Sequence, residues 1–172
     1  APSAFSRMLS SAAHPGYAPI QKYKDDIAKA KAQRERLNNG NPAPAFTYPQ
    51  IDGKMLSLAD LKGKIVLVDF WASWCGPCRK ALPLVKKVNE EFKDKGLQVI
   101  GVSIDKKAKD WEKALEEENL PYLQLNDPHG ITRKLYNYNG IPLIILISPK
   151  GIILEKELWG DGIRKAITQY IK

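Results

Sequence analysis

A run of consecutive apolar residues near the middle of the chain constrains the fold most. Residues 65–70 read Ile-Val-Leu-Val-Asp-Phe, so apolar side chains occupy successive positions and not alternating ones. A strand of this kind is covered on both faces, as in a sheet that lies between helices. Similar runs follow at Leu97–Ile104 and Pro142–Ile147. The pattern predicts an α/β domain with a central sheet flanked by helices.

Turns and helical segments alternate with these strands. The dipeptide Asp52-Gly53 predicts a β-hairpin at the start of the domain, and Ser148–Gly151 predicts a second hairpin near its end. Strands that alternate with helices predict right-handed crossovers and a mixed sheet that ends in an antiparallel hairpin. The expected helices cover residues 58–61, 75–93, 110–118, 132–136 and 161–171, with a kink at Pro83 and Asp161 as the last N-cap.

The first part of the chain has a different pattern. Residues 1–19 are rich in small residues, serine and proline, and residues 20–37 predict a helix with a narrow apolar stripe. Asn38-Asn39-Gly40 ends this helix, and Asn41–Pro44 predicts a linker. A helix with so narrow an apolar stripe is not expected to be stable alone. It needs a surface to pack on, either the main domain or a preceding domain. We therefore divide the chain into a helical extension at residues 1–40 and an α/β domain at residues 41–172.

Composition excludes several classes of protein. With 172 residues, of which 44% are hydrophobic and 27% charged, the chain is typical of a globular protein. Its longest apolar run is far shorter than the ~20 residues of a membrane helix. The net charge of +8 comes from lysines that are dispersed and mixed with acids, so we expect no nucleic-acid partner. His14 and His129 are too distant to complete a zinc site with the two cysteines, and we expect no metal or other cofactor.

The segment Trp74-Cys75-Gly76-Pro77-Cys78 carries the chemistry. It follows the buried strand and opens a helix, where the helix dipole and unpaired N–H groups favour a thiolate. The two cysteines lie one helical turn apart and can cycle between dithiol and disulfide, and Pro77 occupies an early position where its missing N–H costs little. We expect Cys75 to be the exposed nucleophile and Cys78 to resolve the mixed disulfide. The alternatives, a zinc half-site or a passive disulfide, lack a second ligand pair and a long loop to close.

The stretch Val68–Arg79 resembles the active-site segment of thioredoxin-fold proteins. The flanking segments Asp52–Lys54, Gly101–Asp105 and Gly140–Gly151 resemble the TlpA/ResA-like branch of thiol–disulfide oxidoreductases. The resemblance covers residues 41–172 and implies a thioredoxin-like fold. It also implies an exported, periplasmic or membrane-tethered protein whose signal or anchor lies outside this sequence. Such a protein would reduce disulfide-containing protein substrates with electrons from a membrane donor, and residues 1–40 would end a preceding helical domain.

The resemblance implies roles for two further residues. Asp69 lies six residues before Cys75, and burial there should raise its pKa so that it exchanges a proton with Cys78. The alternative is a charge at the strand end that reaches solvent. Pro142 would follow a cis peptide bond that turns the Ile141 backbone toward an extended substrate segment.

For two other residues around the cysteines the sequence leaves alternatives open. Trp74 is either a lid over the disulfide or a half-buried aromatic, and Arg79 is either a solvated charge or a thiolate-stabilising one. Many ResA-like reductases carry glutamate where this chain has Ala81, which argues against specialised cytochrome-maturation chemistry. Leu143 stands where threonine is common, so the substrate groove differs too. We expect substrate contacts at Trp74, Gly76, Pro77 and Ile141, and packing roles for Phe70, Trp71, Trp111 and Tyr122.

The predicted function is a thiol–disulfide oxidoreductase that works mainly as a reductant. The Gly-Pro pair between the cysteines resembles that of thioredoxin, whose potential of about −270 mV is more reducing than that of isomerase and oxidant relatives. One alternative is a redox-responsive binding module that docks partners through the Pro142 groove without turnover. The other is a thiol peroxidase, since the outer pattern also resembles the thiol-specific antioxidant superfamily. That chemistry uses a Pro-x-x-x-Thr-x-x-Cys loop, whereas the corresponding positions here are Val68 and Ala72.

Overall fold

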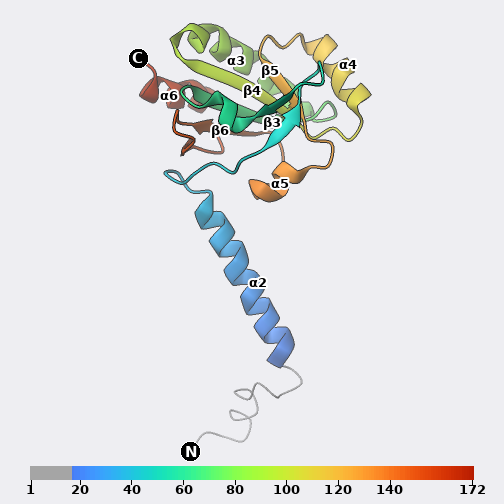
Figure 1. Cartoon of the computed structure of the whole chain (residues 1–172), viewed down its shortest axis with the longest axis vertical. Helices are drawn as coiled ribbons and strands as arrows, with labels where there is room; N and C mark the ends of the chain where they lie inside the picture. Colours follow the sequence, from blue (N-terminus) through green and yellow to red (C-terminus); the bar gives the residue numbers. More distant parts are fainter. Residues whose placement is uncertain (1–16) are drawn as a thin grey trace, which may run out of the picture. The chain divides into compact units, whose positions relative to one another are not determined.

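The computed structural model describes residues 17–172; the small-residue segment at residues 1–16, with His14, lies outside the described residues. The chain divides into one unit that ends at Arg36 and a second unit, Leu37–Lys172. Helix α2 (Tyr17–Arg36) belongs to the first unit and begins three residues before the predicted start (Figure 1). The division at residue 40 stays a prediction. No described helix is both long enough and apolar enough to cross a membrane.

A five-stranded mixed sheet is the framework of the second unit (Figure 1). Its strand order is β5-β4-β3-β6-β7, which places β3 at the centre as predicted. Strand β3 pairs in parallel with β4 and antiparallel with β6, and β4 pairs in parallel with β5. The strands are β3 (Ile65–Trp71), β4 (Leu97–Ser103), β5 (Leu123–Asn126), β6 (Leu143–Ile147) and β7 (Ile153–Glu155).

Helices and turns cover both faces of this sheet, which explains the consecutive apolar positions of β3. Val68 and Phe70 face a core that includes Phe46 and Tyr136. Leu67 faces the opposite core, to which the helices at Gly76–Phe92 and Asp161–Tyr170 contribute. The helical elements are η1 (Leu58–Leu61), α3 (Gly76–Phe92), η2 (Lys93–Lys95), α4 (Ala108–Glu118), α5 (Ile131–Leu135) and α6 (Asp161–Tyr170). The predicted α/β fold class with flanking helices is confirmed.

The predicted hairpin at the start of the domain is also confirmed. Strands β1 (Thr47–Pro49) and β2 (Met55–Ser57) pair antiparallel. In the connecting turn the Lys54 N–H donates to the Asp52 carboxylate at 2.9 Å. Gly53 adopts a φ of 83°, a left-handed conformation that glycine reaches without a Cβ penalty.

Two local predictions are wrong. The segment predicted as a linker instead hydrogen-bonds along the edge of β7: the Ala43 N–H donates to the Gly151 carbonyl at 2.9 Å, and Asn41 accepts from Ile153 at 2.9 Å. An edge strand has unpaired peptide groups, and this segment satisfies them. The N-cap of the last helix is Gly160, and not Asp161, which occupies the first helical position. Its carboxylate there still lies at the positive end of the helix dipole.

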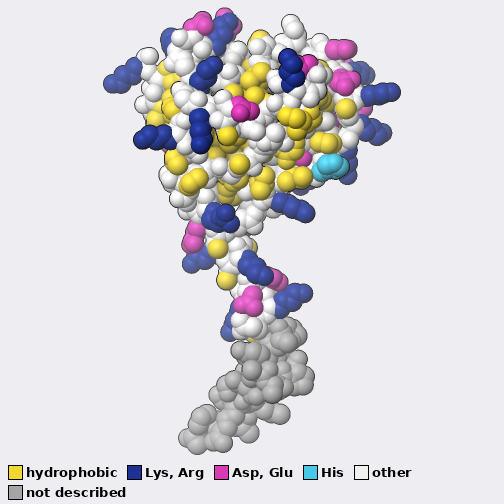
Figure 2. All heavy atoms as spheres, in the orientation of Figure 1, with side chains coloured by type: hydrophobic (Ala, Val, Ile, Leu, Met, Phe, Trp, Pro, Cys, Tyr) yellow, Lys and Arg dark blue, Asp and Glu magenta, His cyan; other side chains and the backbone are white. Residues whose placement is uncertain are grey.

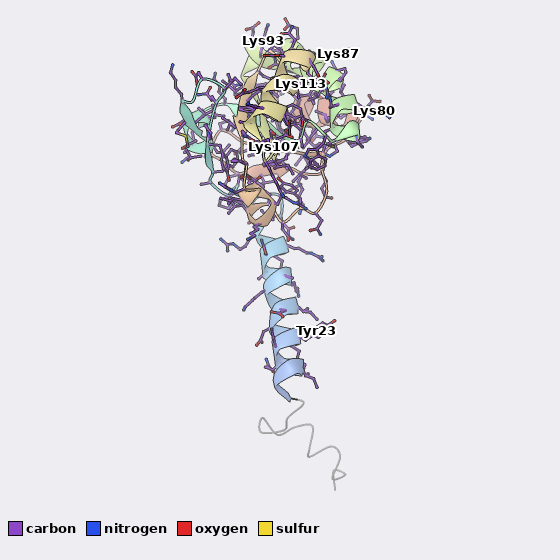
Figure 3. All side chains as sticks on the ribbon, turned by 90° about the vertical axis from the view of Figure 1, so that its right-hand side faces the viewer. Tyr23, Lys80, Lys87, Lys93, Lys107 and Lys113 are labelled. Carbon is purple, nitrogen blue, oxygen red and sulfur yellow. A yellow bond between two sulfur atoms is a disulfide. The ribbon has the colours of Figure 1, made fainter. Side chains whose placement is uncertain are left out.

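The basic side chains of the second unit are scattered over its surface. Figure 2 shows Lys and Arg interspersed with acidic side chains on the visible face. In Figure 3 the labelled lysines Lys80, Lys87 and Lys107 lie apart from one another. Others pair with acids: Lys93 lies 2.8 Å from the Glu90 carboxylate.

Candidate active site

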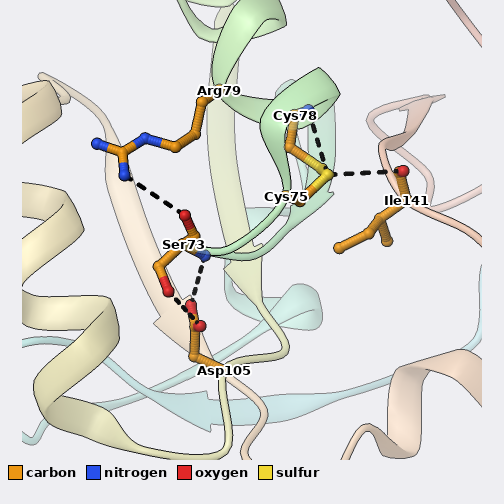
Figure 4. Close-up of a disulfide and its surroundings, with 6 residues drawn as sticks. All are labelled: Ser73, Cys75, Cys78, Arg79, Asp105 and Ile141. Atoms are coloured by element: carbon orange, nitrogen blue, oxygen red, sulfur yellow. Dashed lines mark hydrogen bonds between the residues drawn. A yellow bond between two sulfur atoms is a disulfide. The ribbon is translucent and has the colours of Figure 1, made fainter.

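The loop between β3 and α3 places Cys75 at the N-cap of α3. Its backbone is extended, with φ −89° and ψ 101°, and its sulfur accepts the N–H of Cys78 at 3.2 Å (Figure 4). A serine or aspartate oxygen plays the same part in ordinary N-caps. Gly76 and Pro77 are the first two residues of the helix. A hydrogen bond from an N–H group to a sulfur favours the thiolate over the thiol, so this N–H is placed to stabilise a Cys75 thiolate.

Cys75 and Cys78 form a disulfide with a Cα–Cα distance of 5.2 Å. Cys75 is 5% exposed and Cys78 is completely buried. The prediction that Cys75 is exposed is therefore wrong for the oxidised protein, because the pair packs in an apolar cluster with Trp71, Leu82 and Trp111. Of the two residues, Cys75 is nevertheless the one that solvent reaches.

The segment before β6 faces the disulfide. The Ile141–Pro142 peptide bond is cis, as the resemblance implies. The carbonyl oxygen of Ile141 lies 3.7 Å from the Cys75 sulfur (Figure 4). A disulfide sulfur carries no proton, so this is a contact in the oxidised form, whereas the reduced Cys75 thiol can donate to the same oxygen.

Asp69 lies inside the central strand and is 1% exposed. Its register partners are Gly101 of β4 and Ile144 of β6. Neither carboxyl oxygen has a hydrogen-bond partner among residues 17–172. Burial raises the pKa of Asp69 to about 7. The alternative of a strand-end charge that reaches solvent is therefore wrong, while proton exchange with Cys78 stays a prediction.

Aromatic residues around the site divide into a buried set and one exposed residue. Trp74, which precedes Cys75, is 67% exposed, so it is not a half-buried aromatic. Its role as a lid stays a prediction. The buried set agrees with the expected packing roles and comprises Phe70, Trp71, Trp111 and Tyr122.

Arg79 is ion-paired with two acids, and its side chain is 32% exposed. Its Nε donates to Glu118 at 2.7 Å and its Nη2 donates to Glu117 at 2.6 Å. Its Nη1 also points to the carbonyl oxygen of Ser73 at 3.4 Å (Figure 4). These hydrogen bonds, first the one to Glu117 and then the one to Glu118, raise the pKa of Arg79. Two carboxylates of α4 thus surround this guanidinium, and they oppose the field that it exerts on a thiolate.

Asp105 is a site residue for which sequence reasoning assigned no role. It follows β4 and is 1% exposed. Its Oδ2 accepts the N–H of Ser73 at 2.9 Å, and its Oδ1 accepts the Ser73 hydroxyl at 2.6 Å. The available signal was an aspartate directly after a buried strand, within the segment Gly101–Asp105.

Within residues 17–172 no group of three or more histidine, cysteine, aspartate or glutamate side chains is placed to hold a metal ion.

The model of the AhpC/TSA family matches residues 39–156. The chain belongs to this family. Among curated relatives, the thiol-disulfide oxidoreductase ResA of Bacillus cereus is 28% identical over 141 residues, which cover 82% of this chain and 81% of the relative. Thioredoxin-like protein YneN of Bacillus subtilis is 36% identical over 122 residues, which cover 69% of this chain and 71% of that protein.

Solved structures of thiol-disulfide oxidoreductases are also similar to this chain. The thioredoxin domain of a thiol-disulfide oxidoreductase from Bacteroides vulgatus is 39% identical with a TM-score of 0.75, over 78% of this chain and 99% of that domain. A thiol:disulfide interchange protein from Bacteroides sp. is 39% identical with a TM-score of 0.73, and the match covers 78% of this chain and 90% of that protein. These findings confirm the thioredoxin-like fold and the resemblance to TlpA/ResA-like thiol–disulfide oxidoreductases.

Proposed function

We propose that this protein is a thiol–disulfide oxidoreductase that mainly reduces disulfides in protein substrates, with Cys75 as the nucleophile and Cys78 as the resolving thiol. The observation that carries the proposal is the N-cap position of Cys75, whose sulfur accepts the Cys78 N–H at 3.2 Å. A helix N-terminus stabilises a thiolate, and the thiolate is the form that attacks a disulfide. The names of the curated ResA relatives, thiol-disulfide oxidoreductase, support the same activity.

In the first step the Cys75 thiolate attacks one sulfur of a substrate disulfide. An S–S bond forms between Cys75 and that sulfur, the substrate S–S bond breaks, and the second substrate sulfur leaves as a thiolate. The Ile141–Pro142 segment lies beside Cys75, and the exposed Trp74 precedes it. Together with Gly76 and Pro77, these residues would form the surface on which an extended substrate segment lies.

In the second step Cys78 attacks the Cys75 sulfur. It must first lose its proton, because the thiolate is the attacking species. Burial raises the pKa of Asp69 to about 7, so near neutral pH its carboxylate form is present to take that proton. The internal disulfide forms, the mixed disulfide breaks, and the second substrate thiol leaves. The substrate has gained two electrons, and the protein pair has lost two.

A partner must return two electrons to the disulfide for turnover. The TlpA/ResA-like resemblance supports a membrane donor and a location outside the cytoplasm, periplasmic or membrane-tethered. The docking module without turnover remains the competing function. Peroxide reduction is not supported, since Val68 and Ala72 carry no hydroxyl and are completely buried.

Reduction of insulin by dithiothreitol tests the activity. We expect the wild-type protein to accelerate it and Cys75→Ser to be inactive, because serine supplies no thiolate. Equal rates for these two proteins would contradict the proposal.

A trapping experiment separates a catalyst from a docking module. Cys78→Ser lacks the resolving thiol, so a catalyst accumulates covalent mixed disulfides with its substrates, whereas a docking module does not. Cys75→Ser/Cys78→Ser is the matched control, because it keeps the surface and has no thiol with which to trap.

A further inference from the structure

The residue two positions before Cys75 is held from two sides. Asp105 accepts both the Ser73 N–H, at 2.9 Å, and the Ser73 hydroxyl, at 2.6 Å. On the other side the Arg79 Nη1 points to the Ser73 carbonyl oxygen at 3.4 Å (Figure 4). All three polar groups of Ser73 therefore have partners from separate segments of the chain. We call Ser73, Asp105 and Arg79 the loop clamp.

The Asp105 side of the loop clamp is rigid. Asp105 is 1% exposed, and its Oδ2 also accepts the Ser103 hydroxyl at 2.6 Å. The Ser103 hydroxyl oxygen in turn accepts the backbone N–H of Asp105 at 3.0 Å. A buried carboxylate with this many donors has one favourable orientation, because each lost bond leaves an unpaired polar group.

The Arg79 side connects the loop clamp to helix α4. Arg79 bonds to Glu117 at 2.6 Å and to Glu118 at 2.7 Å, which fixes the plane of its guanidinium. Helix α4 also contributes Trp111 and Ala114 to the apolar cluster that contains both cysteines. This helix therefore reaches the catalytic loop both through packing and through Arg79.

We propose that Asp105 and Arg79 are positioning residues for Cys75: by holding Ser73 they keep the loop in the conformation in which the Cys75 sulfur meets the Cys78 N–H. Cys75 has extended backbone angles as the N-cap, and its own N–H donates to the Ala72 carbonyl at 3.1 Å. A looser loop would lengthen the contact between sulfur and N–H. None of the clamp bonds involves a sulfur atom.

Simple charge effects predict the opposite result, so the two explanations can be separated. Asp105 is negative, and its removal by electrostatics alone would lower the pKa of the Cys75 thiol. Loss of positioning would raise that pKa. Arg79→Lys keeps the positive charge and loses the planar fork that bonds to three oxygens. Electrostatics therefore predict no change for this variant, whereas positioning predicts a higher pKa. Glu117 and Glu118 of α4 are the acids that bond to Arg79. Glu118 and the buried Asp69 of β3 also interact with Tyr122, which precedes β5.

The test measures the pKa of Cys75 from the pH dependence of its alkylation by iodoacetamide. A Cys78→Ser background ensures that only Cys75 reacts. Asp105→Asn offers one carbonyl oxygen where the carboxylate uses two, and Arg79→Lys breaks the fork. Arg164→Lys is the matched control, because Arg164 makes a similar paired contact with Glu91, far along the chain from the loop. Circular dichroism and thermal unfolding check that each variant folds.

We expect Asp105→Asn and Arg79→Lys each to raise the pKa of Cys75 by up to about one unit, roughly a tenfold loss of thiolate at a pH below both values. Arg164→Lys should leave it unchanged. Unchanged or lower values in both clamp variants would overturn the inference. If Asp105→Asn fails to fold, Ser73→Ala takes its place in the test beside Arg79→Lys. This substitution removes one clamp bond, from the Ser73 hydroxyl to Asp105, without a change of charge.

This inference rests on the proposed role of the Cys75 thiolate, and the same titration separates the two. If the parent protein with Cys78→Ser shows a Cys75 pKa near the ~8.5 of free cysteine, the proposed function fails. If the Cys75 pKa is low in the parent protein and equally low in the clamp variants, only the positioning role fails.

Discussion

Replacement of the buried Asp69 by asparagine should change how stability depends on pH. Asparagine has nearly the shape of a protonated aspartate but cannot ionise. In the wild type, burial raises the pKa of Asp69 from 3.8 to about 7. The folded protein therefore holds this proton over a pH range in which the unfolded chain releases it.

The size and sign of the effect follow from that difference. Below pH 3.8 the carboxyl is protonated in both states, so its ionisation costs nothing. Between 3.8 and about 7 the folded state binds more protons than the unfolded state, and wild-type stability falls as the pH rises. At about 1.4 kcal/mol per pKa unit, the full shift corresponds to an upper limit of about 4 kcal/mol, reached above pH 7. Asp69→Asn lacks this pH-dependent loss.

Urea denaturation of the oxidised protein at pH values from 4 to 9 measures this effect. We expect the free energy of unfolding of Asp69→Asn, relative to wild type, to increase steadily from pH 4 to pH 8 and then to level off. Any fixed cost of burying the amide shifts the whole curve and leaves its slope unchanged. Asp94→Asn is the matched control, since Asp94 is exposed, and it should follow the wild-type curve.

A difference between Asp69→Asn and wild type that stays constant from pH 4 to pH 9 would refute the reasoning. It would mean that the carboxyl titrates alike in the folded and unfolded states. The proton-transfer role assigned to Asp69 would then lose its physical basis.

Three further predictions concern packing and substrate contact. Gly101→Ala should lower the free energy of unfolding by about 1–3 kcal/mol in thermal or urea melts, because the added Cβ would clash with a glutamine side chain of β5, whereas the unobstructed Gly140→Ala should change it little. Leu146→Ala removes a completely buried side chain and should cost about 2–5 kcal/mol in the same melts, while the exposed Met55→Ala should stay within about 0.5 kcal/mol. Trp74→Ala should leave the melting temperature unchanged and raise KM for a disulfide substrate, since this side chain is 67% exposed beside the nucleophile.

Much of the fold could be predicted because its signals are local. The consecutive apolar residues of β3 need cover on both faces, and the hairpin turn at Asp52-Gly53 depends on the conformational freedom of one glycine. The linker prediction failed because Pro42 and its neighbours look like a loop in sequence, and only the proximity of an unpaired strand edge gives them backbone partners.

Some features of the candidate site also follow from local sequence, and others do not. The cysteine pair and its position at a helix start follow from spacing, and the burial of Asp69 follows from its apolar neighbours. The partners of Arg79 and Asp105 do not: Glu118 is 39 positions from Arg79, and Asp105 is 32 positions from Ser73. No periodicity in the chain relates such distant residues.

The order of residues alone determined that two sulfurs, one helical turn apart, would stand at the end of a buried strand, because backbone geometry over a few residues decides that. The packing of α4 and of the Ile141–Pro142 segment against them decided how far solvent reaches Cys75 and which groups hold its loop. Those features depend on contacts between segments that are distant in the chain, and such contacts form only when the whole domain folds.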